Sequence, residues 1–146
     1  MADQHLCRLE IPAWECYRLL GQERVGRLAI IESGYPIPIP VSYRLSGTPS
    51  DQRIVFRTAP STSIARYEGR ASLEVDHIIE QEKSAWSVIA RGNLHHLFGD
   101  GTVPDPQPWL IDGRDQWLAL DVVDVSGRRF VGLPDGQGSD IQWHFE

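Results

Sequence analysis

The sequence predicts a single mainly β domain, an antiparallel barrel with short helices at its rim. Two observations support this fold class. About six apolar, strand-like segments follow one another at short spacing, with only one or two helical segments between them. The regular alternation of strand and helix that is typical of a parallel sheet is missing. The 146 residues suffice for one domain with a buried core, and residues 133–146 are expected to form an extended C-terminal tail.

The first predicted element is a short helix over residues 11–20. Pro12 suits the first turn of a helix, and Gly21 is a typical stop signal. The helix is expected to bury one apolar stripe, made of Trp14, Cys16, Tyr17 and Leu20.

Three strands are expected next, over residues 25–31, 36–43 and 53–58. In the second, prolines occupy alternate positions, so that one row of backbone donors is missing and the strand can pair on one side only. The polar residues 46–51 are expected to form the reverse connection to the third strand.

A cluster of hydroxyl side chains follows the third strand. The run Ile54-Val55-Phe56-Arg57-Thr58 breaks at Ala59-Pro60, continues as Ser61-Thr62-Ser63, and leads into a predicted helix over residues 63–68. Hydroxyls at a helix start, with Arg57 and Arg66 within reach, favour an anion site such as a phosphate site, although helix capping is the commoner use of such residues.

The second half of the chain predicts three more strands. They cover residues 70–79, 85–97 and 116–125, and Gly92 lies where a bulge is expected. The proline-rich residues 104–108 are expected to form a loop, with a possible short helix over 109–111. This loop is a candidate lid or interface arm.

Composition excludes several function classes. The formal net charge of −6 disfavours nucleic acid and anionic membranes as partners, and no apolar run is long enough to span a bilayer. The start of the chain has no secretory signal, so the expected location is the cytoplasm. Cys7 and Cys16 predict neither a disulfide nor a zinc site, and the adjacent His95 and His96 would point to opposite faces of a strand, so no metal site is expected.

Several motifs together resemble the pyridoxamine 5'-phosphate oxidase-like proteins, which are flavin-binding split β-barrels, and most closely their small bacterial branch. These motifs lie within residues 10–130 and occur in the order of that family. They are Arg24-Val25-Gly26-Arg27-Leu28-Ala29, Pro40-Val41-Ser42-Tyr43, Ile54-Val55-Phe56-Arg57-Thr58, Glu74-Val75-Asp76, Trp86-Ser87-Val88 and Arg91-Gly92.

The resemblance implies a six-stranded split barrel, a homodimer with two FMN sites at the subunit interface, and oxidoreductase activity on a small-molecule substrate. By the same resemblance, Pro40, Val41, Ser42 and Tyr43 line the ring, and Arg57 and Thr58 contact the ring and the ribityl chain. Ser61, Thr62 and Ser63 hold the phosphate, and Trp86 and Ser87 close the site. Because this loop carries no cation of its own, Arg66 is expected to supply the positive charge for the phosphate. No catalytic residue is assigned, because the flavin itself supplies the redox chemistry.

Two departures from the family pattern keep alternatives open. Related sequences commonly carry a lysine in the phosphate loop, where this chain has Ser63. The ligand could therefore be the deazaflavin coenzyme F-420, or the chain could be a non-catalytic dimeric nucleotide-binding or sensing module with weakened or lost cofactor binding. The basic C-terminal signature of true pyridoxamine phosphate oxidases is also missing, so vitamin B6 synthesis is not expected.

Overall fold

The computed structural model of the chain describes residues 6–98, 103–108 and 115–132. The expected helix over 109–111, the tail over 133–146 and the side chain of Cys7 lie outside this description. The elements in chain order are β1 (Leu6–Ile11), α1 (Ala13–Gln22), β2 (Val25–Glu32), β3 (Tyr35–Thr48), β4 (Asp51–Thr58), the 3-10 turn η2 (Ile64–Arg66), β5 (Gly69–Ile79), β6 (Ser84–Leu97) and β7 (Gln116–Gly132).

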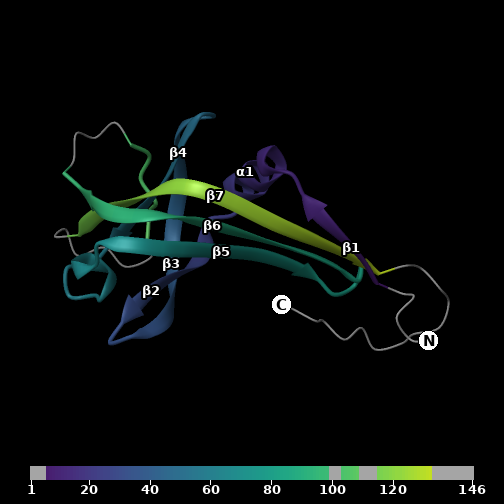
Figure 1. Ribbon diagram of the computed structural model, residues 1–146, viewed down its shortest axis with the longest axis horizontal. Coiled ribbons are helices and arrows are strands. Elements are labelled where there is room, and N and C mark those ends of the chain that lie inside the picture. Colours follow the sequence, from purple (N-terminus) through teal and green to yellow (C-terminus); the bar gives the residue numbers. More distant parts are fainter. Residues whose placement is uncertain (1–5, 99–102, 109–114, 133–146) are drawn as a thin grey trace.

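Six of the seven described strands close into a ring, which confirms the predicted split-barrel class. The antiparallel order is β7-β4-β3-β2-β5-β6, and a pairing between β6 and β7 completes the circle. Figure 1 shows β5, β6 and β7 as long neighbouring strands, with α1 near β7. The barrel removes the open sheet edges that a flat sheet of these strands would expose.

Strand β1 was not predicted, and β7 is longer than expected. The second half of β7 pairs with β6 on one side and with β1 on the other, where Leu6 is opposite Gly132 and Ile11 is opposite Gly127. The polar sequence at residues 126–129 would suit a loop, but two strand partners hold it in an extended conformation.

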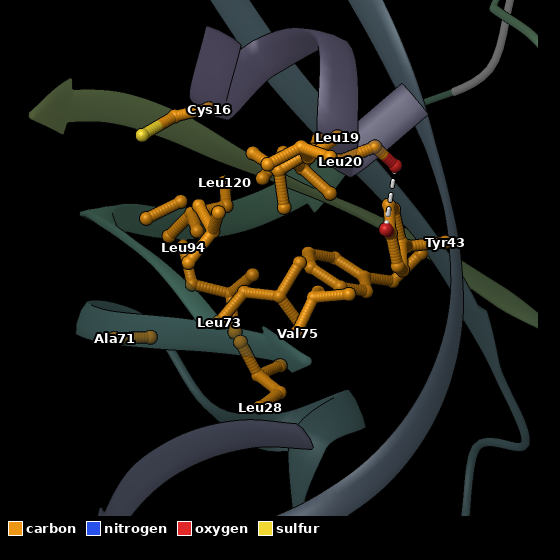
Figure 2. Close-up of a cluster of buried hydrophobic side chains, with 14 of the residues drawn as sticks. Cys16, Leu19, Leu20, Leu28, Tyr43, Ala71, Leu73, Val75, Leu94 and Leu120 are labelled. Carbon is orange, nitrogen blue, oxygen red and sulfur yellow. Dashed lines mark hydrogen bonds between the residues drawn. The ribbon is translucent and has the colours of Figure 1, made fainter. Parts of the chain in front are cut away.

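The helix α1 packs one face against the core of the barrel. Its buried residues are Cys16, Leu19 and Leu20, whereas Trp14 is 68% exposed, so its expected place in the buried stripe was wrong. Trp14 precedes Cys16 by two residues, which is more than half a turn of helix, and therefore lies on the opposite side. In Figure 2 the α1 side chains face Leu94 and Leu120 of the barrel.

A tight turn connects β2 to β3. Ser33 and Gly34 both have positive φ, as in the tight two-residue turns that match the twist of a hairpin. Residues 35–42 of β3 pair only with β2, and residues 43–48 pair with β4. One-sided pairing of the proline-rich stretch is therefore confirmed.

The barrel opens between β2 and β5. These strands pair only through residues 27–29 and 72–74, so residues 30–32 of β2 continue without β5 as a partner. Close by, the register of β6 and β7 shifts between Arg91 and Gly92, which confirms the expected bulge. Together, the short pairing and the bulge shape the outer surface at this end of the barrel.

Candidate functional site

The hydroxyl loop after β4 is shorter and less helical than predicted. Instead of a helix over 63–68, the chain makes the three-residue turn Ile64–Arg66, whose Ile64 and Ala65 are buried. A single 3-10 turn has few aligned peptide dipoles, so the predicted attraction of an anion to a helix start does not apply here. A helix dipole therefore contributes little to anion binding at this loop.

Two of the three loop hydroxyls bind other groups of the chain. The Thr62 hydroxyl donates to the Ala59 carbonyl at 2.9 Å, lies 2.8 Å from the Thr58 hydroxyl, and accepts from the Ala65 backbone N–H at 3.3 Å. The Ser63 hydroxyl donates to a Glu32 carboxylate oxygen at 3.0 Å. Ser61 is exposed. The side chains of Thr58 and Thr62 thus stabilise the turn itself.

Arg57 is held in an ion-pair cluster. Its guanidinium lies 3.1 Å from Asp105 and 3.0 Å from Asp115, and it stacks over the ring of Trp117 with a centroid distance of 5.4 Å. The Asp115 side chain is only 2% exposed. Arg57 therefore compensates a buried carboxylate and ties the segment 103–108 to the barrel, a role that does not require a ligand.

Arg66 is placed differently from Arg57. It is exposed and makes no ion pair with any residue in the described ranges. It lines a small hollow of about 200 Å³, whose walls are Ile30, Ile31, Glu32, Ser63, Arg66 and Tyr67. Of the predicted phosphate residues, the structure thus brings Ser63 and Arg66 to one hollow.

A larger groove of about 600 Å³ begins beside this hollow and shares Ile30 and Ile31 with it. It lies where β2 and β5 separate and where β6 and β7 shift register. Its lining residues are Ala29, Ile30, Ile31, Pro36, Arg70, Ala71, Ser72, Arg91, Gly92, Asn93, Val123 and Asp124. The lining is mostly apolar, with a few amide, hydroxyl and guanidinium groups.

The polar groups of the groove differ in how firmly they are held. Two hydrogen bonds of 2.9 and 2.7 Å join Arg91 to the carboxylate of Asp124 on the paired strand. Arg70 makes no ion pair with any described residue, although its backbone carbonyl accepts a hydrogen bond from Tyr67. The groove thus contains one neutralised arginine and one arginine that can bind an anion or a carbonyl.

The other predicted site residues do not border either hollow in the single chain. Tyr43 is fully buried and donates to the Leu20 carbonyl at 2.6 Å (Figure 2), and burial raises its pKa well above the usual range. Trp86 packs in the core and stacks on His77. The remaining four residues are Pro40, Val41 and Ser42 of β3 and Ser87 of β6, which lie further along the same strands.

A carboxylate pair lies on the outer face one row beyond the groove. Glu74 and Asp76 share Arg27, whose Nη1 is 3.2 Å from each carboxylate. Burial raises the pKa of Glu74 to about 7, hydrogen bonding to Asp76 and its charge add to that shift, and Arg27 opposes it. The face next to the groove therefore changes its charge near neutral pH.

Sequence reasoning missed most of the groove residues, including Ala29, Ile31, Ser72 and Asn93. The groove residues come from five strands, β2, β3, β5, β6 and β7, that meet only through the barrel register. The one local signal was Arg91-Gly92, since a glycine inside a strand often marks a bulge or a close approach. Within the described residues, no cluster of His, Cys, Asp and Glu could hold a metal ion, and no helix is long and apolar enough to cross a membrane.

Comparison with known proteins gives a consistent family assignment. A conserved protein of unknown function from Corynebacterium diphtheriae is 27% identical, with a TM-score of 0.70 over 85% of this chain and 98% of that one. The FAD binding protein of Mycobacterium smegmatis is 21% identical, with a TM-score of 0.66 over 84% and 98%. A FAD-binding protein from Mesorhizobium loti is 23% identical, with a TM-score of 0.66 over 86% and 98%.

The last two structures are similar in fold alone at these identities. No curated protein matches the chain. The family model described as pyridoxamine 5'-phosphate oxidase matches residues 12–129, which is most of the chain. The chain therefore belongs to the pyridoxamine 5'-phosphate oxidase-like family of split β-barrels.

Proposed function

We propose that this protein is a flavin-nucleotide-binding oxidoreductase that acts on a small molecule in the cytoplasm. The observation that carries the proposal is the groove of about 600 Å³ at the barrel opening, which shares Ile30 and Ile31 with the hollow of Ser63 and Arg66. A volume of several hundred cubic ångströms suits a cofactor of this size. The FAD-binding descriptions of the M. smegmatis and M. loti structures support the same ligand class.

The groove fits the flat ring of a flavin. Ala29, Ile31 and Val123 offer apolar surface, and Ser72 and Asn93 offer hydrogen-bonding groups for the polar edge of a ring. This combination of apolar walls with a few polar groups is typical of cofactor sites. The hollow fits the phosphate end less strongly, because the carboxylate of Glu32 lines it together with Arg66.

When bound, the flavin supplies hydride and electron transfer. The chain supplies binding and exclusion of water: the apolar walls bury the ring faces, and Arg66 binds the phosphate. Arg70 would stabilise negative charge on the ring or on a substrate, since it makes no ion pair with any described residue.

The functional unit in this proposal is a homodimer with its cofactor sites at the interface. Ile31 is 54% exposed and Val123 is 71% exposed, and both line the groove. A second copy that covered them would also shield a bound ring from water. Ser42 of β3 and Ser87 of β6 are separated by β2 and β5, and in this proposal they contact the cofactor of the partner subunit.

A non-catalytic binding module is the second candidate. The ion pairs of Arg57 and the intramolecular hydrogen bonds of Thr62 favour it, because they leave fewer groups to bind a phosphate. Reduction of the bound flavin by NAD(P)H or reduced deazaflavin, followed by turnover of a quinone or nitro compound, would support the enzyme. Binding without turnover would support the module.

Flavin binding is tested by absorbance titration of the purified protein and of two tryptophan variants. Ala29→Trp fills the groove, because Ala29 lines it between Pro38 and Ser72 on the paired strands. Thr48→Trp adds the same side chain at the exposed β3–β4 hairpin, away from both hollows. We expect micromolar or tighter binding in the parent and in Thr48→Trp, and at least a tenfold loss in Ala29→Trp. Equal binding in all three would contradict the proposed location, and no binding in the parent would contradict the function.

A further inference from the structure

We propose that the substrate of this site is an organic acid, whose carboxylate or other anionic group is bound by Arg70 in the open part of the groove. The inference rests on the proposed function, because it places the substrate in the groove beside a bound flavin. It deepens that function by naming the substrate class and the residue that recognises it.

Arg70 lies where two strands of the barrel separate. The pairing of β2 with β5 ends at Ala29 and Ser72, so Arg70, the next residue of β5 on the same face, has no partner on β2. On its other side it pairs with Asn93 of β6. Arg70, Ser72 and Asn93 all line the groove. The side chain of Arg70 therefore belongs to the wall of the groove where the space between the strands opens.

The backbone of Arg70 is fixed, whereas its charged group is available. The Tyr67 hydroxyl donates a hydrogen bond of 2.6 Å to the backbone carbonyl of Arg70, and the pairing with Asn93 holds the same residue in the sheet. The guanidinium itself makes no ion pair or hydrogen bond with any residue in the described ranges. A substitution of the side chain thus leaves these two backbone anchors in place.

The carboxylate across β6 from Arg70 is bound by other cationic side chains. Asp121 of β7 pairs with Asn93, which in turn pairs with Arg70. One oxygen of Asp121 accepts a hydrogen bond of 3.1 Å from Arg53, and the other lies 2.8 Å from Nε2 of His95. Asp121 therefore does not neutralise Arg70.

Two further acidic side chains near Arg70 also have other partners. Asp124, which lines the groove, accepts hydrogen bonds of 2.9 and 2.7 Å from Arg91. Glu68, two residues before Arg70, has an oxygen 3.7 Å from Nδ1 of His96. Arg70 thus keeps an uncompensated positive charge in the groove, although the whole chain has a formal net charge of −6.

An anionic group suits this wall of the groove. The planar guanidinium can donate two parallel hydrogen bonds to a carboxylate, and such charge-assisted bonds are stronger than bonds between neutral groups. The Asn93 amide and the Ser72 hydroxyl offer further donors, and neither side chain makes a hydrogen bond within the described part of the chain. A neutral substrate gains the polar contacts but not the attraction between opposite charges.

The remaining lining favours an acid with an apolar body. Ile31 of β2 and Pro36 of β3 line the groove on the side away from β6, and Val123 of β7 lines it beyond the bulge. Ile31 is 54% exposed and Val123 is 71% exposed, so both offer apolar surface to a ligand. Apolar walls with one charged group that orients the ligand are typical of small-molecule sites.

The test measures how the flavin-saturated protein binds matched pairs of an acid and its amide in equilibrium dialysis. The pairs are para-nitrobenzoate with para-nitrobenzamide, and anthraquinone carboxylate with its carboxamide. The members of each pair have nearly the same shape and differ by one charge. We expect the parent to bind each acid at least about fivefold more tightly than its amide.

Three variants assign this preference to a residue. Arg70→Gln keeps hydrogen-bond donors but removes the charge, so it should abolish the preference for the acid. Arg70→Lys keeps the charge without the planar fork and should retain part of it. Arg24→Gln is the matched control, because Arg24 is also exposed and without an ion pair in the described residues, but lies between α1 and β2, at the end of β2 far from Ile31. It should retain the full preference.

The outcomes separate this inference from the proposed function. If the parent binds flavin but binds acid and amide equally, or binds neither, the substrate class is wrong and the proposed function stands. The assignment to Arg70 also fails if Arg24→Gln loses the preference to the same extent, since overall charge then sets it. If Arg70→Gln loses flavin affinity but keeps the preference, Arg70 binds the flavin instead of the substrate. A parent that binds no flavin overturns the proposed function and this inference with it.

Discussion

At the scale of single residues, the two arginines predicted near the phosphate have different roles. Arg57 is 16% exposed and lies between Asp105 and the buried Asp115, whereas Arg66 is exposed at the hollow. The residues next to each arginine in the sequence do not reveal this difference, because the partners of Arg57 come from a segment about 50 residues away. The first arginine stabilises the fold and the second is available to a ligand.

Arg57→Met tests the structural role. Methionine keeps the apolar stem beside Trp117 but leaves the Asp115 carboxylate buried without a counter-charge, so we expect unfolding to become easier by about 2–4 kcal/mol in chemical denaturation. Arg18→Met is the control, since Arg18 forms only an exposed pair with Glu15 and should cost no more than about 0.5 kcal/mol. If Arg57→Met leaves the stability unchanged but abolishes flavin affinity, Arg57 binds the phosphate and the structural role is wrong.

Glu74 predicts how stability depends on pH. Its pKa in the folded protein is raised from 4.5 to about 7, so the folded state binds this proton more tightly than the unfolded state. The resulting stabilisation is present below pH 4.5 and is lost as the pH rises to about 7.

Glu74→Gln mimics the protonated side chain at every pH. Its melting temperature should therefore match that of the parent near pH 4.5 and exceed it at pH 8, as measured by thermal unfolding at both pH values. Glu82→Gln, in the exposed turn, should show no such trend. If the melting temperature of Glu74→Gln at pH 8 is equal to or below that of the parent, the ion pair with Arg27 stabilises the ionised Glu74 by more than its burial costs.

At the scale of elements, the bulge between β6 and β7 shapes one wall of the groove. A Cβ added at Gly92 would collide with the backbone carbonyl oxygen of Asp121 and lie 2.8 Å from its carbonyl carbon. The backbone of β7 cannot move aside without breaking its hydrogen bonds to β6. Gly92 is thus required by the close approach of two strands.

Gly92→Ala should lower the free energy of unfolding by about 2–4 kcal/mol and weaken flavin binding, because the strands must separate at the groove. Gly21→Ala is the contrasting control. Its Cβ would lie 3.6 Å from Leu45, an ordinary contact, and alanine favours the helix, so stability should hold or rise by up to about 1 kcal/mol. Equal stability of the parent and Gly92→Ala in denaturant titration would show that the bulge can relax.

Most elements could be predicted from local patterns. The alternating prolines of β3 and the glycine in β6 each have a local cause, so their consequences were confirmed. Strand β1 and the end of β7 were missed because each is stabilised by a partner more than a hundred residues away. The groove was missed for the same reason, since it is formed by the register of five strands and not by any one segment.

At the scale of the whole molecule, the proposed dimer covers the groove and the exposed Ile31 and Val123. Val123→Arg places a charge in this apolar surface, so we expect the parent to have twice the mass of one chain by light scattering and the variant to be a monomer with weaker flavin binding. Trp14→Arg changes an equally exposed apolar residue on α1 and should leave the dimer intact. A monomeric parent that still binds flavin would contradict the interfacial site.

The central claim is that a flavin ring lies in the groove between β2, β5 and the bulge of β6. A crystal structure of the protein grown with FAD, with FMN and coenzyme F-420 as parallel trials, tests it most directly. We predict a ring against Ala29, Ile31 and Ser72, with its phosphate beside Arg66. A flavin bound elsewhere on the barrel would contradict the account. An empty groove in crystals grown at a saturating ligand concentration would contradict it as well.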